Sequence, residues 1–146
     1  MILELLKRLG ARATAPDPQH LTALAAAVLL LEVSWADNEI EAVELGVIER
    51  TLRERFDLDE SEINELIAEA RKDHVESVGV FDYTRTINAN WDEAAKFDLI
   101  VALWRLAFAD DDLNRYEEHT IRRIAELLYV SHERFIEAKL SATRND

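Results

Sequence analysis

The sequence predicts an all-α fold built as a single compact domain, and three observations lead to this prediction. The chain has 146 residues, which is the size of one ordinary domain. It contains only 3 Gly and 2 Pro, so it offers few of the tight turns that a many-stranded β fold needs. Apolar residues make up 49% of the chain and recur at helical spacing, and no segment reads clearly as a strand.

The N-terminal part is expected to hold a short amphipathic helix over residues 2–9, which Gly10 ends. Residues 1–18 are therefore assigned to this helix and a linker, and residues 19–146 to the helical domain. A second helix should begin at Pro18, after the cap Asp17, and run to about residue 36. Its apolar run of 11 residues would span about 16 Å, half of a bilayer's hydrocarbon core, so we expect a buried core helix.

The following helices bring the expected total to about seven or eight. They are predicted at about residues 41–55, 59–71, 82–87, 93–109, 114–128 and from 132 onward. Asp59–Glu62 and Asn90–Glu93 both match the capping-box pattern, and Ser131 is expected to cap the last helix. Residues 73–81 are predicted to form a loop or a brief extended piece.

An internal repeat is the most informative feature of the sequence. When 28–50 is aligned with 101–123 without gaps, 7 of the 23 aligned positions are identical. Chance would give about one or two identities at ordinary residue frequencies. The repeat predicts a two-fold pseudo-symmetry between residues 21–70 and 94–142, with the two apolar helices side by side in the core.

Composition excludes several classes of function. The net charge of −13 argues against nucleic-acid binding, which calls for a basic face. The absence of Cys excludes disulfides, thiolate metal sites and a Cys nucleophile. No segment resembles a targeting signal or a membrane span, so we expect a soluble, cytoplasmic protein that does not insert into membranes. No nucleophile stands beside a base and an orienting partner, so we do not expect an enzyme.

The repeat places an acidic turn in each half, in the segments 35–44 and 108–117. Oxygen-bearing side chains occur at relative positions 1, 2, 3, 5 and 8 of both turns. Clustered carboxylates without His or Cys suit the hard cations Ca²⁺, Mn²⁺ and Mg²⁺. The turns are not EF-hand loops, because their sixth positions are Ala42 and Arg115 and their twelfth are Ile48 and Ile121.

Alternative roles for these acids stay open on the sequence alone. Acidic residues near a helix N-terminus interact well with the helix dipole, and a Glu at the third helical position commonly caps. The acids could also form a metal-independent face for a basic protein partner. A third possibility is metal-assisted hydrolysis, although no other catalytic group accompanies the carboxylates.

The segments 30–40 and 103–113, each followed by a Glu four residues on, resemble the phrase A-D-G-x-[IL]-x-x-x-E of the TerB (tellurite-resistance) family. The resemblance covers roughly residues 20–142. It implies a compact helical domain in which acids at the turns bind metal. By position these acids are Asp37, Glu39 and Glu44 in the first turn, and Asp110, Asp112 and Glu117 in the second.

The resemblance also implies a role and a partner. Members of the family are thought to join membrane-associated stress-response assemblies, so a protein partner is expected. The present chain departs from the family at Asn38 and Asp111, where Gly is usual. Tellurite itself is not the expected ligand, because an oxyanion would be repelled by a domain of this charge.

Three further features carry expectations about packing. The residues Trp35, Trp91, Trp104, Phe97, Phe108 and Tyr129 occur at helical spacings and are expected in the core. Gly46 lies inside a helix and suggests a close helix approach. Asp98 and Arg105 interrupt the most apolar helix. They are expected to form either a buried pair or the solvent-exposed edge of that helix.

Overall fold

The computed structural model describes residues 18–34, 40–76, 80–109 and 115–144. These residues form seven helices and no strand, so the predicted all-α fold is confirmed. The expected helix over residues 2–9 lies outside the described residues. The helices are α2 (Pro18–Ser34), α3 (Ala42–Phe56), α4 (Glu60–Glu76), α5 (Phe81–Asn90), α6 (Glu93–Phe108), α7 (Arg115–Leu127) and α8 (His132–Arg144).

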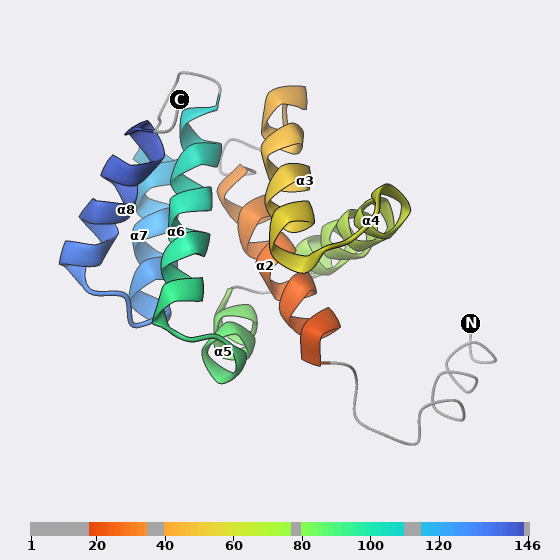
Figure 1. Cartoon of the computed structure of the whole chain (residues 1–146), viewed down its shortest axis with the longest axis horizontal. Coiled ribbons are helices and arrows are strands. Elements are labelled where there is room, and N and C mark those ends of the chain that lie inside the picture. The colour runs from red at the N-terminus through yellow and green to blue at the C-terminus, as the bar shows by residue number, and fades with distance from the viewer. Residues whose placement is uncertain (1–17, 35–39, 77–79, 110–114, 145–146) are drawn as a thin grey trace.

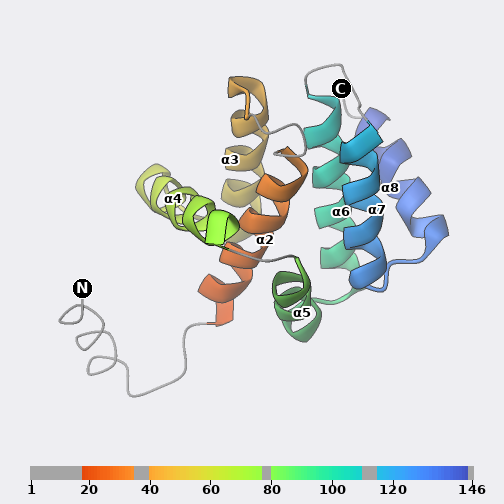
Figure 2. The same ribbon diagram turned by 180° about the vertical axis from the view of Figure 1, so that it is seen from behind.

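Helix α2 lies at the centre of the fold, with other helices around it (Figures 1 and 2). Every residue from 22 to 31 is buried, and α2 contacts α3, α4, α5, α6 and α7. A helix that is apolar on all sides can be stable only when it is covered on all sides. In the described part of the chain, no helix is long and apolar enough to cross a membrane.

The second apolar helix, α6, packs directly against α2, as the repeat predicts. Residues 99–104 of α6 are all buried, and Trp104 is its largest fully buried side chain. The two helices together supply most of one continuous hydrophobic core, to which the other helices add their inner faces. Burial of apolar surface between α2 and α6 therefore joins the two halves of the chain.

The contacts between helices repeat in the two halves. Helix α2 packs on α3 and α4, just as α6 packs on α7 and α8. Contacts across the halves are also matched, because α3 touches α6 and α7 touches α2. Helix α5 joins the halves and contacts α2 and α7. The arrangement has the two-fold pseudo-symmetry that the internal repeat predicts.

The repeat changes register by one position before its third helices. Asp57 and Tyr129, which follow α3 and α7, have positive φ angles of 53° and 60°, whereas the alignment of 28–50 with 101–123 would pair Asp57 with Val130. The buried residues of α4 and α8 keep the new register, because buried Ile63 corresponds to buried Phe135 and not to Ile136. One position is thus missing from α7 relative to α3.

Two of the four predicted helix caps are confirmed, and a third, Asp17, lies outside the described residues. Asp59 and Glu62 form the capping box of α4, with Glu62 N–H donating to Asp59 Oδ1 at 2.8 Å and Asp59 N–H donating to Glu62 Oε1 at 3.0 Å. Ser131 Oγ accepts from the backbone N–H of Arg134 at 3.2 Å. These bonds satisfy N–H groups that the first turn of a helix leaves without an intrahelical acceptor.

The predicted capping box at Asn90 is wrong, because the cap of α6 is Asp92. Its Oδ1 accepts from Ala95 N–H at 2.9 Å. Asn90 is still the last residue of α5, and its side-chain amide donates to the carbonyl of Thr86 at 2.8 Å. The short connection between the two helices therefore begins one residue after the expected cap.

The expected loop or extended piece over 73–81 is largely helical in its described part. Helix α4 continues through Glu76, and α5 begins at Phe81; residues 77–79 lie outside the described residues. Tertiary contact explains the longer helix, because His74 Nε2 lies 2.7 Å from Glu32 Oε2 of α2. This interaction fixes the last turn of α4 against the central helix.

Candidate functional site

Of the six acids predicted to bind metal, the structure describes two. Glu44 lies in the first turn of α3, and Glu117 lies in the first turn of α7. These helices follow the two acidic turns, so the two glutamates occupy equivalent places in the pseudo-symmetric halves. The other four predicted ligands, Asp37, Glu39, Asp110 and Asp112, lie outside the described residues, as do Asn38 and Asp111.

Both described glutamates are almost completely withdrawn from solvent. Glu44 is 1% exposed and Glu117 is 2% exposed, the values of core residues. Glutamate is rarely fully buried in proteins unless its charge is compensated. The sequence predicted the positions of these two acids, but nothing in it indicated that they are buried.

The local bonding of Glu44 shows that it also caps a helix. Glu44 Oε1 accepts a hydrogen bond from the backbone N–H of Glu41 at 2.9 Å, and the two residues form a capping box at the start of α3. This bond uses one of the several lone pairs of the carboxylate. The capping role that the sequence allowed is therefore present at Glu44.

A buried hydroxyl lies at the entrance to the first acidic turn. Ser34 is the last residue of α2 and is 1% exposed, and its Oγ has no hydrogen-bond partner in the described part of the chain. The repeat-equivalent residue is Ala107, which carries no oxygen. A buried hydroxyl oxygen without a partner usually marks a place for water or for a ligand. The residues that directly precede the two acidic turns therefore differ, because one carries a hydroxyl group and the other does not.

The described residues alone do not complete a metal centre. Among them, no group of three or more His, Cys, Asp or Glu side chains is arranged to hold an ion. A cation bound by Glu44 or by Glu117 would therefore take its further ligands from the acidic turns. The donors available are oxygens, which suit hard divalent cations.

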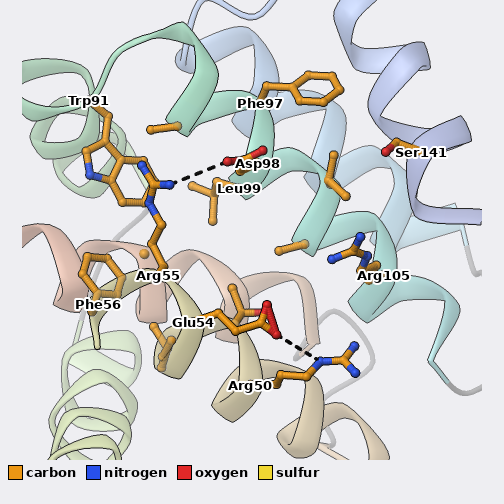
Figure 3. Close-up of a pocket in the computed structure, with 16 residues that line it drawn as sticks. Arg50, Glu54, Arg55, Phe56, Trp91, Phe97, Asp98, Leu99, Arg105 and Ser141 are labelled. Atoms are coloured by element: carbon orange, nitrogen blue, oxygen red, sulfur yellow. Dashed lines mark ion pairs between the residues drawn. The ribbon is translucent and has the colours of Figure 1, made fainter. Parts of the chain in front are cut away.

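A second candidate site is a cavity of about 310 Å³ along α3 and α6 (Figure 3). Arg55 pairs with Asp98 across it at 3.6 Å, and the Arg55 guanidinium lies 4.9 Å from the centre of the Trp91 ring. Arg105 also lines the cavity, so Asp98 and Arg105 are not a buried pair. Asp98 is exposed and Arg105 is half-buried, so they lie on the solvent-facing edge of α6, which is the second of the two predicted arrangements.

No pattern in the sequence indicated this cavity. Its walls come from residues distant in the chain, on α2, α3, α6 and α8 and in the connection after α5, and no spacing along one helix brings them together. The one available signal was the pair of charges within the apolar helix α6. Such residues are costly to bury and often lie where a helix borders a cleft.

The aromatic residues are distributed more widely than expected. Trp104 is fully buried and stacks on Phe108 with ring centres 5.7 Å apart. Tyr129, expected in the core, is 83% exposed and has a positive φ at the end of α7. Trp91 and Phe97 are half-buried and line the cavity, and Trp35 lies outside the described residues.

An acidic groove lies between the start of α2 and α4. It has a volume of about 500 Å³, and three glutamates of α4 line it: Glu62, Glu65 and Glu69. His20 of α2 reaches across, with Nε2 3.1 Å from Glu69 Oε1. The spacing of the glutamates places them along one exposed side of α4.

The comparisons with known proteins agree with this architecture. No curated protein and no solved structure shows significant similarity to the chain. A family model described as tellurite resistance protein TerB matches residues 23–140, which span α2 to most of α8. The match includes both acidic turns, both buried glutamates and the paired helices of the two halves. The chain therefore belongs to the TerB family.

Proposed function

We propose that this TerB-family chain is a non-catalytic domain that binds Ca²⁺, Mn²⁺ or Mg²⁺ at its two acidic turns. The bound form would contact a protein partner, which can be membrane-associated, in a stress-response assembly of the tellurite-resistance type. The observation that carries the proposal is the paired burial of Glu44 and Glu117 at equivalent places beside the turns.

Burial of a carboxylate is the physical argument for an ion. Removing the charged group from water costs several kcal/mol unless positive charge or strong hydrogen bonds compensate it. The acidic turns add further carboxylates of the same sign close by in the sequence, which raises the cost. A divalent cation held by Asp37, Glu39 and Glu44, and a second held by Asp110, Asp112 and Glu117, would remove this cost in both halves.

Capping alone accounts poorly for the burial. Glu62 makes the same kind of capping bond at the start of α4, yet it is exposed. A capping glutamate in this fold therefore does not need to leave solvent. Glu44 is 1% exposed, although it makes an equivalent bond at the start of α3. The difference supports a further role for Glu44, and by the repeat for Glu117.

The first test measures thermal stability with and without cations. A ligand that binds only the native state stabilises it by mass action, by about 2.7 kcal/mol at a concentration about 100 times its Kd. Millimolar Ca²⁺ or Mn²⁺ is expected to raise the Tm of the chelator-treated protein at low ionic strength. Equal Tm values with Ca²⁺, Mn²⁺, Mg²⁺ and chelator would contradict cation binding.

The second test separates a metal ligand from a helix cap. Glu117→Gln keeps the shape and the hydrogen-bonding groups but removes the charge, and Gln also serves in a capping box. We expect the cation affinity to fall at least about tenfold, or about 1.4 kcal/mol, while the metal-free Tm changes little. Glu44→Gln should have a smaller effect, because Asn38 makes its turn less anionic.

Two variants provide matched controls for that experiment. Glu126→Gln removes an exposed charge from the same helix, α7, and Glu62→Gln alters a capping glutamate at the surface. Both should keep the cation affinity of the wild type. Unchanged affinity in Glu117→Gln would remove it from the ligands, and a large drop in its metal-free Tm would identify it as a cap.

The acidic groove favours a second candidate function, a metal-independent interaction module. Glu62, Glu65 and Glu69 face a cavity that has room for the side chains of a basic segment. A lysine-rich peptide titrated into chelator-treated protein should then shift the amide resonances of α4. If Glu65→Gln combined with Glu69→Gln leaves that binding unchanged, the groove is not the contact surface.

A further inference from the structure

The cavity between α3 and α6 has features of a small-molecule site that is separate from the acidic turns. Its volume of about 310 Å³ lies at the lower end of the range typical of ligand pockets. Aromatic rings form part of its lining: Phe56 stacks on Trp91 with ring centres 5.9 Å apart at one end, and Phe97 of α6 lies apart from that pair (Figure 3). The Arg55 guanidinium lies 4.9 Å from the centre of the Trp91 ring and the Arg134 guanidinium lies 3.9 Å from the centre of the Phe97 ring, so a planar group can contact only the ring surface that these arginines leave uncovered.

The charge in this cavity is opposite to that of the whole chain. Three arginines, Arg50, Arg55 and Arg105, line it together with two acids, Glu54 and Asp98. Three positive and two negative groups leave a net charge of +1, in a chain of net charge −13. A cluster of arginines on so acidic a protein creates a local preference for an anion.

Arg105 is the arginine with free hydrogen-bonding capacity. Arg50 pairs with Glu54 at 3.9 Å and Arg55 pairs with Asp98 at 3.6 Å, whereas Arg105 forms no ion pair with any residue that the structure describes. Figure 3 shows its guanidinium beside the cavity, apart from both pairs. The group is half-buried, so its donors are partly withdrawn from water without an ion-pair partner among the described residues.

The pseudo-symmetry provides an internal comparison for Arg105. Its repeat-equivalent residue is Glu32 of α2, which has a partner on the third helix of its half: Glu32 Oε2 lies 2.7 Å from His74 Nε2. In the second half, the position equivalent to His74 is 146, which lies outside the described residues; among the described residues, α8 offers Ser141 to the cavity and no acid. Among the described residues, Glu32 thus has an ionisable partner on the third helix of its half, whereas Arg105 has none and lines the cavity.

We infer that this cavity binds a small organic monoanion, a carboxylate attached to a planar apolar body. Arg105 binds the carboxylate through its fork of N–H donors, and the rings of Trp91 and Phe97 contact the body. The net charge of +1 matches a monocarboxylate better than a phosphate monoester, which carries nearly two negative charges at neutral pH. Glu54 and Asp98 would repel the second charge.

The test titrates the full chain with naphthalene-2-carboxylate and, separately, with the neutral 2-naphthamide, and follows the indole N–H resonance of Trp91 by NMR. The carboxylate is expected to give saturable shifts and to bind at least about tenfold more tightly than the amide. In Arg105→Gln this preference should disappear. The matched control is Arg53→Gln, an exposed arginine of α3 that does not line the cavity, and it should keep wild-type affinity.

Several outcomes would overturn the inference. The absence of saturable shifts, equal binding of acid and amide, or equal losses in Arg105→Gln and Arg53→Gln would each exclude the proposed site. Tighter binding of 2-naphthyl phosphate than of the carboxylate would exclude the monocarboxylate assignment. If Arg105→Gln does not fold, the comparison of acid with amide on the wild-type chain still decides the question.

Discussion

Gly46 lies in the interior of α3, where glycine is an unfavourable helix residue. The sequence suggested that it permits a close approach of another helix, but the structure does not support this. Gly46 is exposed, and a Cβ built on it meets no atom within 4 Å among the residues that the structure describes. The missing side chain therefore serves no packing contact in the described fold, and only the conformational cost of glycine remains.

Gly46→Ala is expected to stabilise the protein. Alanine removes the helix-propensity penalty of glycine and lowers the entropy of the unfolded chain, which together amount to up to about 1 kcal/mol. In a domain of this size the Tm should rise by roughly 2–4 °C per kcal/mol. Differential scanning calorimetry measures the change. A lower Tm would mean that the position is packed against another part of the chain after all.

The candidate sites differ in how far single residues could be predicted. Glu44 and Glu117 were singled out as candidate ligands from the sequence because the repeat places a Glu at the same distance from each acidic turn. Their burial was not foreseen, because it depends on the packing of α3 and α7 on the opposite halves. Arg105 was noticed only as a charge in an apolar helix, since its neighbours in the cavity lie far away in the sequence.

At the scale of the helix, starts were easier to predict than ends. A cap is a local signal, because a short polar side chain bonds to an N–H two or three residues later. Both confirmed caps, Asp59 and Ser131, follow this rule. The end of α4 was placed too early, because its last turn is held by the contact of His74 with Glu32, 42 residues away. Such a contact leaves no local trace in the sequence.

The cap of α6 gives a prediction that distinguishes two neighbouring residues. Asp92→Ala removes the acceptor for Ala95 N–H and should destabilise the protein by about 1 kcal/mol. Asn90→Ala removes an exposed bond at the end of α5 and should cost less than about 0.5 kcal/mol. Urea unfolding measures both. If Asn90→Ala destabilised the protein more than Asp92→Ala does, Asn90 rather than Asp92 would be the cap of α6.

The change of register in the repeat also belongs to this scale. Beyond Arg50 and Arg123 the same alignment still pairs some identical residues, but in α4 and α8 it pairs buried residues with exposed ones, such as buried Ile63 with exposed Ile136. The structure shows why, because the chain leaves α3 through Asp57 and leaves α7 through Tyr129, one position earlier than the alignment requires. A search at one fixed shift cannot follow a deletion inside a helix. Asp57 and Tyr129, which both have positive φ angles, are therefore the equivalent residues at the ends of α3 and α7.

For the whole molecule, the all-α class, the two halves and the adjacency of the two apolar helices were all predicted from composition and repeat. Their success has a physical reason. A run as apolar as 21–31 must be covered on every side, and the strongest apolar face elsewhere in the chain belongs to α6. The shared α2–α6 contact means that neither half has a complete core of its own.

The shared core predicts a single cooperative unfolding transition. The calorimetric enthalpy should equal the van't Hoff enthalpy, at about 100 kcal/mol near 60 °C for a chain of this length. Differential scanning calorimetry of the chelator-treated protein provides both values. Two resolved transitions, or a van't Hoff enthalpy near half of the calorimetric one, would show that the halves unfold separately.

The central position of α2 has a consequence for the synthesis of the protein. Ribosomes make α2 before nearly all of the helices that cover it: α2 ends at Ser34, whereas α6 is completed only at Phe108. Until α6 has been made, the helices of the second half cannot cover the apolar surface of α2 in the nascent chain. Such a segment is the kind of surface that binds chaperones or aggregates. The architecture that makes the finished domain cooperative therefore makes its early growth dependent on protection.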